Sequence, residues 1–409
     1  MAERAEIVVV GAGPAGIAAA CAARECGRSV RVVDENPHAG GQIWRGELPQ
    51  PWRTRWEQAA VPMQAGATAF GFAGEQTLLV ECEGRAMEIA FERLIVATGA
   101  RERLLPFPGW TLPGVTGAGG LQALMKSGLD LAGRRVVVAG SGPLLAEAGA
   151  SLLAAGALVA IVAEQASFRQ MIPFLGRIAA RRGKWTQALR IASALRKTRY
   201  RAGAWPLSVE RRDGALSVTL RLGPRREVIE CDYLACGFGL LGNTELAQLA
   251  GCQVVNGCVV VDEHQRTSVL GIYCAGEPVG IAGVESALAQ GLTAGYHAAG
   301  REDLATACTP GRDRGRRFQR VLAEAFALRP ELKELATPDT IICRCEDVRL
   351  GELAGFLTWR EAKLHTRCGM GACQGRVCGA ALEFVAGMPA ASVRPPLVPV
   401  SVGVLAGEQ

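Results

Sequence analysis

The first forty residues alternate between short apolar runs and glycine or polar positions. Residues 7–10 are all apolar, a glycine-rich turn and an alanine-rich stretch follow, and a second, mainly apolar run covers 29–33. Short apolar runs bounded by glycine and polar residues are typical of buried strands, whereas the longer alanine-rich stretch is typical of a helix. We therefore expect strand, turn, helix and strand in that order, with Asp34 and Glu35 directly after the second strand.

The same pattern returns later in the chain. It begins at Arg134 and reads RRVVVAGSGPLLAEAGASLLAAGALVAIVAEQ. Strand-like residues follow at 206–222, a polar and helical segment covers 301–338, and three prolines occupy the tail at 395–399. Two such units in 409 residues predict an α/β protein of two or three domains. The prolines predict an extended tail that lies on another surface of the protein.

Charge and composition argue against several classes of function. The formal charge of +6 is small for 409 residues, and no basic arm with interleaved aromatic residues indicates nucleic-acid binding. The N-terminus lacks a signal-peptide pattern, and no run of about 18 uncharged apolar residues would span a membrane. We therefore expect a cytoplasmic protein whose fourteen cysteines are thiols or metal ligands rather than disulfides.

The first glycine-rich turn is a candidate dinucleotide site. Gly11, Gly13 and Gly16 form G-x-G-x-x-G, which permits a tight turn, close approach of the backbone to a pyrophosphate and close helix–strand packing. The helix that follows offers free N–H groups to phosphates. Asp34 stands 18 residues after Gly16, close to the spacing of an acid that binds ribose. The alternative is a tight turn in an ordinary α/β unit.

Further motifs resemble the two-dinucleotide-domain flavoproteins, the superfamily of glutathione and thioredoxin reductases. These motifs are GAGPAG with its acid, then GGQ at 40–42, LIVATGA at 94–100 and GIYCAGE at 271–277. The resemblance implies FAD, with Glu277 in the place of the usual aspartate that holds the ribityl chain. The FAD-binding residues implied are Gly11, Gly13, Pro14, Ala15, Gly16, Asp34, Glu35, Gly41, Gln42, Ala97, Thr98, Gly99, Gly276 and Glu277.

The second glycine motif departs from the pattern of that superfamily. Gly140 and Gly142 are present and Glu164 ends the next strand, but Leu145 occupies the third glycine position. A side chain there disfavours hydride donation by NAD(P)H, because the backbone of the helix can no longer approach closely. An adenine nucleotide, ATP or NAD(P), and a fold retained for packing both stay open. No cysteine pair follows the GGQ motif, so thiol–disulfide chemistry at the flavin is disfavoured.

Five cysteines crowd the C-terminal part. Cys343 and Cys345 form C-x-C, Cys373 and Cys378 form C-x4-C, and Cys368 precedes the second pair. Thiolates in two pairs can hold zinc or an iron–sulfur cluster, although zinc more often uses C-x2-C; reduced structural thiols are the remaining alternative. Glycines around the second pair would let backbone N–H groups point at cluster sulfurs, because glycine adopts positive φ.

This C-terminal part resembles the bacterioferritin-associated-ferredoxin type of [2Fe–2S] domain. CRCEDV and GMGACQGRVC are closest to the version fused to α subunits of heteromeric amino-acid and opine dehydrogenases. Those include hydroxyproline dehydrogenase, octopine and nopaline oxidases, hydrogen cyanide synthase and dye-linked proline dehydrogenase. The resemblance implies that Cys368 is a bystander and that the cluster ligands are Cys343, Cys345, Cys373 and Cys378.

The resemblance also implies an architecture of two Rossmann-like dinucleotide-binding domains plus a small helical C-terminal [2Fe–2S] domain. We expect a discontinuous FAD domain and a second nucleotide-binding-type domain. The expected ranges are 1–105 and 230–300 for the FAD domain, 106–229 for the second domain, 301–338 for a linker, and 339–409 for the cluster domain with its tail.

The function implied is that of an electron-transferring α subunit. Its expected partners are a β subunit of amino-acid-oxidase type with its own FAD and a small γ ferredoxin-like subunit. Peripheral association of the complex with the inner membrane face is compatible with a quinone as electron acceptor. Two alternatives stay open: a self-sufficient NAD(P)H-dependent FAD reductase, and a non-catalytic scaffold with a structural nucleotide. The basic stretch 169–201 fits a solvated surface helix or a docking surface for another protein or an anionic nucleotide.

Overall fold

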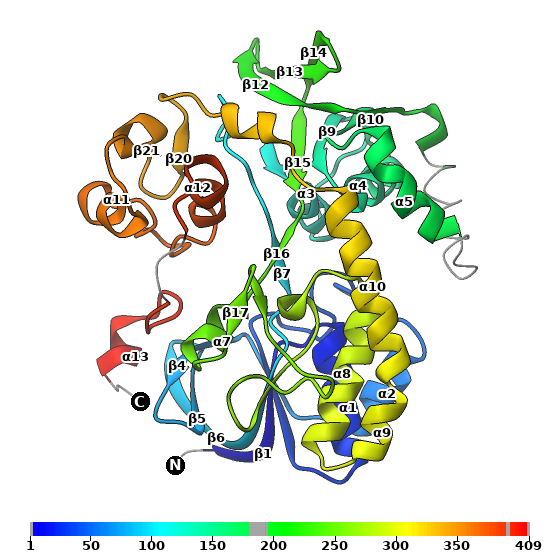
Figure 1. Cartoon of the computed structure of the whole chain (residues 1–409), viewed down its shortest axis with the longest axis vertical. Coiled ribbons are helices and arrows are strands. Elements are labelled where there is room, and N and C mark those ends of the chain that lie inside the picture. The colour runs from blue at the N-terminus through cyan, green and yellow to red at the C-terminus, as the bar shows by residue number, and fades with distance from the viewer. Residues whose placement is uncertain (1–2, 180–192, 194, 390–392, 407–409) are drawn as a thin grey trace. The chain divides into compact units, whose positions relative to one another are not determined.

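The computed structural model describes residues 3–179, 193, 195–389 and 393–406 (Figure 1). Part of the basic stretch at 169–201 lies outside the described residues, which omit 180–192 and 194. The chain divides into two compact units. The first unit comprises 1–101, 241–320 and 392–409, and the second comprises 102–240 and 321–391. The finer division predicted from the sequence stays a prediction.

The first unit is built on a seven-stranded sheet, as Figure 1 shows. The predicted apolar run at 7–10 lies in β1, which pairs in parallel with β2 and β6, and Ile7, Val8 and Val9 are fully buried. Burial on both faces explains why these strands read as continuous apolar runs rather than alternating ones. The strand order is β3-β2-β1-β6-β5-β4, and β19 also pairs with β6. The strands are β1 (Glu3–Val10), β2 (Val30–Asp34), β3 (Met63–Ala65), β4 (Ala67–Phe72), β5 (Thr77–Cys82), β6 (Arg85–Val96) and β19 (Ile272–Cys274).

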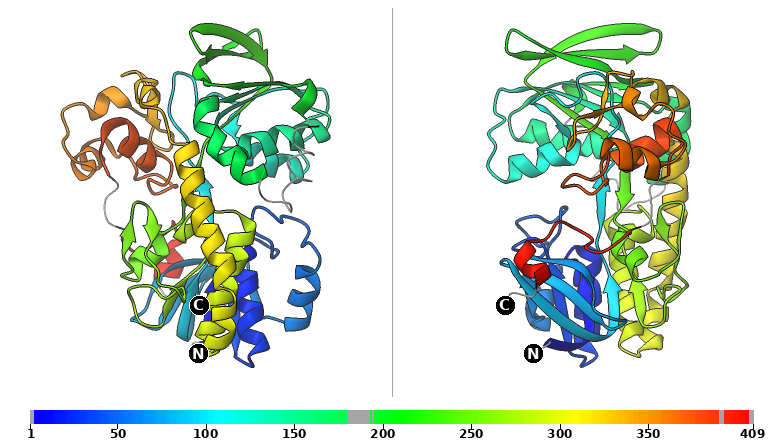
Figure 2. Two further views of the ribbon diagram at one scale, coloured as in Figure 1. Left: turned by 45° about the vertical axis from the view of Figure 1, so that its right-hand side comes forward. Right: turned by 90° about the vertical axis from the view of Figure 1, so that its left-hand side faces the viewer.

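Two helices of the first unit approach each other unusually closely. Helices α1 (Pro14–Glu25) and α8 (Val284–Ala298) lie side by side (Figure 2, left). A side chain at Gly291 would place its Cβ 2.1 Å from the Ala15 carbonyl oxygen, so the contact is made by backbone. The remaining elements are α2 (Trp52–Ala59), α7 (Glu245–Leu249), α9 (Glu302–Ala307), α13 (Val402–Ala406), β17 (Val254–Val255), β18 (Cys258–Val259) and the 3₁₀ helix η3 (Glu277–Val279).

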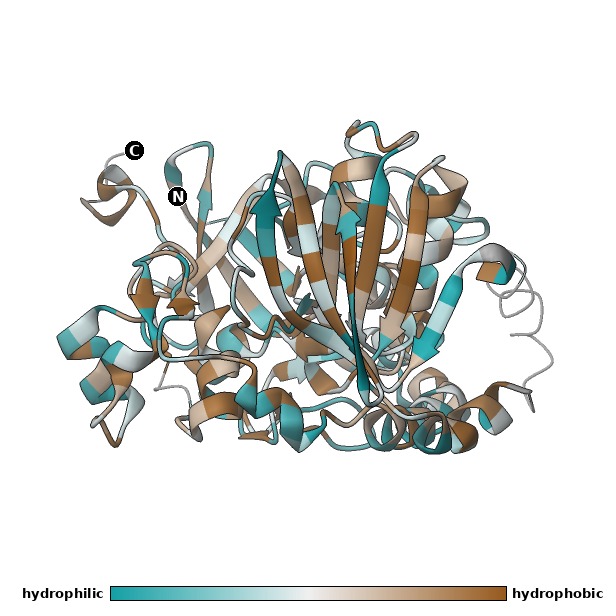
Figure 3. Cartoon of the chain, turned by 90° about the horizontal axis from the view of Figure 1, so that it is seen from above, coloured by the Kyte–Doolittle hydropathy of each residue, from teal (hydrophilic) through white to brown (hydrophobic). Residues whose placement is uncertain are grey.

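The second unit has its own five-stranded parallel sheet in the order β11-β10-β9-β15-β8. A separate antiparallel sheet, β12-β13-β14, lies nearest the viewer in Figure 3, where its strands mix hydrophilic and hydrophobic colours. The strands are β8 (Val115–Gly117), β9 (Arg135–Ser141), β10 (Leu158–Glu164), β11 (Arg199–Ala202), β12 (Ala204–Arg212), β13 (Ala215–Leu222), β14 (Arg225–Cys231) and β15 (Tyr233–Phe238). The helices are α3 (Ala118–Lys126), α4 (Pro143–Ala154), α5 (Phe168–Ala179) and the 3₁₀ helix η2 (Leu195–Lys197).

Within the described residues, three segments carry the chain between the two units. Strands β7 (Ala100–Glu102) and β16 (Leu240–Gly242) pair with each other where the chain leaves and re-enters the first unit. Helix α10 (Thr309–Ala325) forms the third connection. Among the described residues, no helix combines the length and the apolar character needed to cross a bilayer.

The cysteine-rich part folds around a small core of its own within the second unit. Its centre contains Ile342, Leu353, Trp359 and Leu382 together with Cys343, Cys368 and Cys378. The short elements that surround this core are η4 (Pro330–Glu334), β20 (Ile341–Cys343), β21 (Val348–Arg349), η5 (Leu350–Leu353), α11 (Trp359–Thr366) and α12 (Cys378–Ala386).

The proline-rich tail returns to the first unit. The Leu397 N–H donates a hydrogen bond of 2.7 Å to the Phe70 carbonyl on β4, and Leu397 is buried in the core of that unit. This is the surface contact that an extended, proline-rich segment can make without further secondary structure.

The backbone contact between α1 and α8 generates a stability prediction. Gly291→Ala should destabilise the protein by about 1–3 kcal/mol, because the new methyl group overlaps the Ala15 carbonyl oxygen. Gly176→Ala is the matched control, since no atom of the described residues lies within 4 Å of its Cβ position on α5, and it should be neutral or stabilising by up to about 1 kcal/mol. Urea denaturation measures both, and an equal effect of the two substitutions would contradict the close contact.

Candidate functional site

The glycine turn of the first unit forms a tight backbone cradle. A Cβ at Gly16 would lie 1.8 Å from the Gly11 carbonyl oxygen, and one at Gly11 would lie 2.3 Å from the Ala97 carbonyl oxygen. Gly11 also has a φ of 105°, a conformation that favours glycine. The first turn of α1 therefore packs directly on the loop that ends β1, as the motif predicts.

The N-terminus of α1 is open to an anion. Gly13 caps the helix without a side-chain hydrogen bond, and Pro14 occupies its first turn. The N–H groups of that turn therefore keep their capacity to donate, and the helix dipole adds positive potential there. Gly41 lies beside this end of the helix, because a Cβ on it would be 3.0 Å from the Gly13 Cα. The arrangement matches the requirements of a pyrophosphate.

Asp34 fixes the turn from the end of β2. One carboxylate oxygen accepts a hydrogen bond of 2.5 Å from the Ala12 N–H, and the other accepts one of 2.7 Å from the Asn36 N–H. Asp34 is buried, whereas Glu35 next to it is exposed. Residues that follow β2 also line a cavity of about 610 Å³ together with residues of β3. Its lining includes Pro37, His38, Ala39, Met63 and Ala65.

The two later FAD motifs converge on the same region. Thr98 donates from its hydroxyl to the Asn243 carbonyl oxygen at 2.6 Å, and the Asn243 amide donates back to the Thr98 carbonyl oxygen at 2.9 Å. The Gly276 N–H donates to Gln290 at 2.8 Å, and a Cβ at Gly276 would lie 2.9 Å from that of Ala15. Three segments that are distant in the sequence thus meet around the start of α1.

Glu277 begins η3 close to Gly99, since a Cβ on that glycine would lie 3.9 Å from the Glu277 Oε2. Desolvation raises the pKa of the Glu277 carboxyl group. Within the described part of the chain, no hydrogen bond to this carboxyl group is found. A confined carboxyl group without a partner is costly unless a ligand supplies one, so the residue fits a site for ligand hydroxyl groups. The Gln42 side chain accepts a hydrogen bond from Arg45 at 2.8 Å, and its role in FAD binding stays a prediction.

The second glycine motif is arranged differently. The Glu164 carboxylate accepts hydrogen bonds from the Gly142 N–H at 2.7 Å and the Ala166 N–H at 2.8 Å, and it is fully buried. Burial raises the pKa of Glu164 to about 7. At Gly140 a Cβ would lie 1.8 Å from the Gly237 carbonyl oxygen, and Leu145 is buried in the core beside α4.

The chain covers the ends of β9 and β10 with its own residues. The Ser141 hydroxyl donates to the Phe326 carbonyl oxygen at 3.2 Å, and Gln165 donates to the Ala327 carbonyl oxygen at 3.2 Å. The Arg329 N–H in turn donates to Gln165 at 3.2 Å. The segment 326–329 thus contacts the residues on either side of the second glycine motif and its acid, Ser141 and Gln165, and a nucleotide at Gly140, Gly142 and Glu164 stays a prediction.

The five clustered cysteines lie together in the C-terminal part. The sulfur atoms of Cys343, Cys368 and Cys378 all lie within 4.8 Å of one another, and all three residues are buried. Cys373 hydrogen-bonds to Cys378 and to Cys345, which is exposed. The thiols therefore form a continuous set that takes members from both halves of the predicted motif.

Contacts between the thiols cross the two halves, and one more joins Cys373 to Cys378 within C-x4-C. Cys343 of C-x-C contacts Cys378 of C-x4-C, and Cys345 contacts Cys373. Hydrogen bonds from Cys368 and Cys378 lower the pKa of the Cys343 thiol, and the hydrogen bond with Cys343 raises the pKa of Cys368 to about 12. The pKa of Cys373 is also lowered, by its hydrogen bond with Cys378. A set of close thiols in which two readily form thiolates has the donor chemistry of a metal or iron–sulfur site.

Backbone N–H groups point at these sulfurs as expected. Gly369, with a φ of 83°, donates to Cys343, and Gly375, with a φ of 77°, donates to Cys373. Hydrogen bonds of this kind tune the potential of a cluster and orient its ligands.

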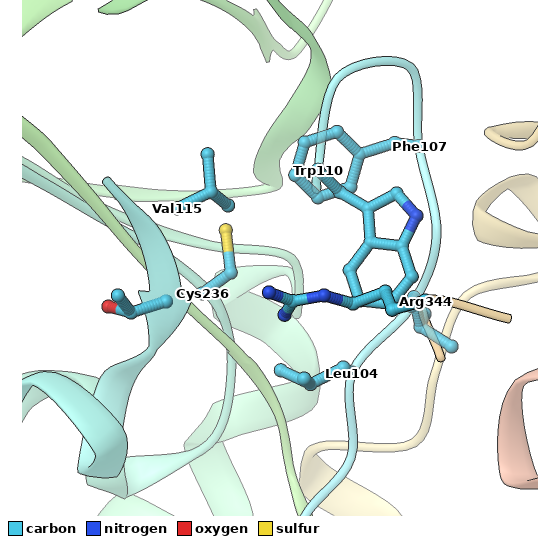
Figure 4. Close-up of a pocket in the computed structure, with 8 residues that line it drawn as sticks. Leu104, Phe107, Trp110, Val115, Cys236 and Arg344 are labelled. Carbon is cyan, nitrogen blue, oxygen red and sulfur yellow. The ribbon is translucent and has the colours of Figure 1, made fainter. Parts of the chain in front are cut away.

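Arg344 stands between two of the predicted ligands but its side chain turns away from them. Its guanidinium group lies 5.3 Å from the centre of the Trp110 ring and points into a cavity of about 10 Å³ (Figure 4). The Trp110 indole N–H donates to the Ile341 carbonyl oxygen at 2.6 Å. Trp110 thereby contacts the ligand loop at both Ile341 and Arg344. The residues that line the cavity are Leu104, Leu105, Phe107, Trp110, Val115, Thr116, Cys236 and Arg344.

Comparison with known proteins agrees with both parts of this picture. Residues 5–291 match the family described as "Pyridine nucleotide-disulphide oxidoreductase". Over 98% of both chains, the sequence is 33% identical to an opine oxidase subunit of Rhizobium meliloti (strain 1021). The chain belongs to the pyridine nucleotide-disulphide oxidoreductase family, in the group that includes this opine oxidase subunit. It is also 30% identical to hydrogen cyanide synthase subunit HcnB of Pseudomonas aeruginosa, over 91% of this chain and 90% of that one.

Solved structures support the fold. L-proline dehydrogenase from P. horikoshii matches with a TM-score of 0.70 and 21% identity over 99% of this chain and 80% of its own. Thioredoxin reductase from T. acidophilum matches with a TM-score of 0.57 and 20% identity over 73% of this chain and 98% of its own. The prediction of an α/β fold of the thioredoxin reductase type, followed by a small helical part with clustered cysteines, is confirmed. Members of this family are oxidoreductases, and the family implies FAD.

The sequence alone did not indicate several residues that hold the loops of the two candidate sites in place. Asn243 and Gln290 hold the ATG and GIYCAGE loops through side-chain hydrogen bonds, and Trp110 holds the ligand loop. The sequence does contain a signal for Gln290, because it is a lone amide among small residues of a predicted helix. In the structure this side chain is buried, with 2% of its surface exposed. Asn243 and Trp110 had none, because their partners are distant in the sequence.

The two adjacent acids at the end of β2 can be distinguished by FAD affinity. Asp34→Ala removes the acceptor that orders the Ala12 N–H and that the glycine motif predicts for a ribose, and it should weaken FAD binding roughly ten- to a hundred-fold. Glu35→Ala is the matched control and should stay within about twofold of the unmodified chain, because Glu35 is exposed. Titration of the apoprotein with FAD measures both, and equal losses would show that Asp34 has no special role.

Proposed function

We propose that the chain is the electron-transferring, FAD- and [2Fe–2S]-containing subunit of a heteromeric dehydrogenase that oxidises the C–N bond of an amino acid or opine to an imine. The observation that carries the proposal is the presence of two separate cofactor-type sites in one chain, the cradle at α1 and the thiol set at Cys343–Cys378. Two relatives are named as subunits, one of an opine oxidase and one of a hydrogen cyanide synthase, and an L-proline dehydrogenase shares the fold.

The first unit supplies the groups that FAD requires. The open N-terminus of α1 would receive the pyrophosphate, Asp34 would orient a ribose, and Glu277 would accept or donate a hydrogen bond at the ribityl chain. Gly99 and Gly276 keep the backbone of the two later motifs close to this space. When bound, FAD supplies electron transfer in steps of one or two electrons, and the chain supplies position and electrostatics.

The thiols of the C-terminal part suit a [2Fe–2S] cluster. The resemblance assigns Cys343, Cys345, Cys373 and Cys378 as ligands. Contacts of Cys343 with Cys378 and of Cys345 with Cys373, beside the contact of Cys373 with Cys378, support two pairs of ligands. Each pair would hold one iron, and the N–H groups of Gly369 and Gly375 would stabilise the negative sulfurs. The exposed Cys345 leaves one side of the site open to an electron donor or acceptor.

The chain needs a partner to complete this reaction. We propose a β subunit of amino-acid-oxidase type as the site of substrate oxidation and a small γ ferredoxin-like subunit as a further partner, with a dye or quinone as acceptor. The names of the relatives support a multi-subunit enzyme. A quinone acceptor would favour peripheral association with the inner membrane face. Co-purification from the native source tests this directly, and a chain that purifies alone while retaining full dehydrogenase activity would refute it.

The cluster assignment predicts a loss of iron on substitution. Cys373→Ala should reduce iron and acid-labile sulfide at least about tenfold and remove the visible absorption of the cluster, because one iron loses a ligand. Cys258→Ala is the matched control, since this partly buried cysteine lies on β18 of the first unit, and it should retain the iron. Retention of wild-type iron in Cys373→Ala would contradict the assignment, and zinc in place of iron would favour the alternative metal.

The enclosed second motif predicts a poor response to nicotinamide nucleotides. Under anaerobic conditions, NADH and NADPH should leave the flavin absorbance unchanged over minutes, because Glu164 is buried and the segment 326–329 covers the ends of β9 and β10. Dithionite should bleach the same flavin, which serves as the control. Rapid bleaching by NADH would instead establish a self-sufficient reductase, and a protein purified without any FAD would support the scaffold alternative.

A further inference from the structure

Cys368 is a fifth thiol at a site that the resemblance builds from four. It is 1% exposed, and its sulfur lies within 4.8 Å of those of Cys343 and Cys378. It hydrogen-bonds to both of these thiols, whereas within the described part of the chain no such bond joins it to Cys345 or Cys373. Cys368 therefore belongs to one side of the thiol set, the side where Cys343 and Cys378 would share an iron.

The backbone holds Cys368 in this place. Helix α11 ends at Arg367, which adopts a left-handed φ of 64°, and the Cys368 N–H donates to the Thr366 hydroxyl at 3.3 Å. The next residue, Gly369, packs so closely on Trp359 that a Cβ would lie 2.6 Å from its ring. The chain on both sides of Cys368 is thus fixed by the core of the C-terminal part, and its sulfur is directed to the site by that core.

The separation is short enough for ligand exchange. Two thiolates on one tetrahedral metal, with bonds of about 2.3 Å, lie about 3.8 Å apart. The sulfur of Cys368 lies at most 4.8 Å from those of its two neighbours, so a shift of about 1 Å brings it to the position of a ligand. A rotation of the side chain provides such a shift without movement of the backbone.

We propose that Cys368 is a reserve ligand of the cluster, able to replace Cys343 or Cys378 on the iron that these two share. This inference rests on the [2Fe–2S] site of the proposed function. In the exchange, a sulfur–iron bond from Cys368 replaces that of the displaced cysteine. The Cys368 thiol proton passes to the displaced thiolate, or to solvent in a variant that lacks that cysteine. The number of electrons on the cluster does not change. Replacement is specific to one side, so Cys368 does not substitute for Cys345 or Cys373.

Alanine variants of the full-length chain test the proposal through iron, acid-labile sulfide and the electron paramagnetic resonance spectrum of the dithionite-reduced protein. Cys368→Ala should retain the iron of the unmodified chain, because four ligands remain. Cys343→Ala and Cys378→Ala should each retain at least about half of the iron with altered g-values, since a different sulfur binds. The double variants Cys343→Ala/Cys368→Ala and Cys378→Ala/Cys368→Ala should lose iron at least about tenfold relative to the singles.

Two results would overturn the inference. If Cys343→Ala and Cys378→Ala are as empty as the double variants, Cys368 does not substitute; if Cys368→Ala alone is empty, it is a primary ligand instead. Because the proposal expects the same behaviour at both positions, either single variant carries the test if the other does not fold. Absence of iron from the unmodified chain is a separate result, which refutes the cluster itself rather than the reserve role.

Discussion

The first unit depends on the direct packing of α1 on the backbone around it. The helix meets the turn at Gly11 through Gly16 and meets α8 through Gly291, and at both contacts a Cβ would overlap a carbonyl oxygen. These contacts bring the start of the helix to the ends of β1, β6 and the loop after β19. An open helix terminus is thereby surrounded by the Asp34 carboxylate and the loops at Gly99 and Gly276. A phosphate-binding geometry follows from the absence of side chains at a few positions.

The second unit repeats the strand–helix–strand topology of the first but lacks the close packing of the helix on its glycine turn. Leu145 fills the position that corresponds to Gly16, and its side chain is buried in the core of that unit. The acid at the end of the next strand is also enclosed, and its oxygens already accept backbone hydrogen bonds. The residues at 326–329 then bind to Ser141 and Gln165. The two units therefore share a topology but differ at the carboxyl ends of their strands, which are open to a ligand in the first unit and covered by the chain in the second. This difference is consistent with a dinucleotide site in the first unit only.

The thiol set shows how a site depends on contacts between separated segments. Cys343 ends the short strand β20 and Cys345 follows it, whereas Cys378 begins α12. The loop that carries Cys368 and Cys373 is shaped by packing on Trp359. Backbone N–H groups from that loop reach the sulfurs. The segment that carries Cys343 and Cys345 is attached through Trp110 and Arg344, so the chemistry of the sulfurs is coupled to the packing of the second unit.

The sequence by itself determined the strands, the glycine turns and the residue types at each candidate site. These follow from local rules, because apolar runs, positive-φ glycines and cysteine spacing are properties of adjacent residues. The tertiary structure decided which groups meet. It joined Thr98 to Asn243 and Gly276 to Gln290, paired the cysteines across their two motifs, and brought Cys368 beside two of them. It also joined Gln165, the neighbour of Glu164, to Arg329, 164 positions later in the chain. Such contacts depend on how separate elements pack, and no local pattern in the sequence encodes them.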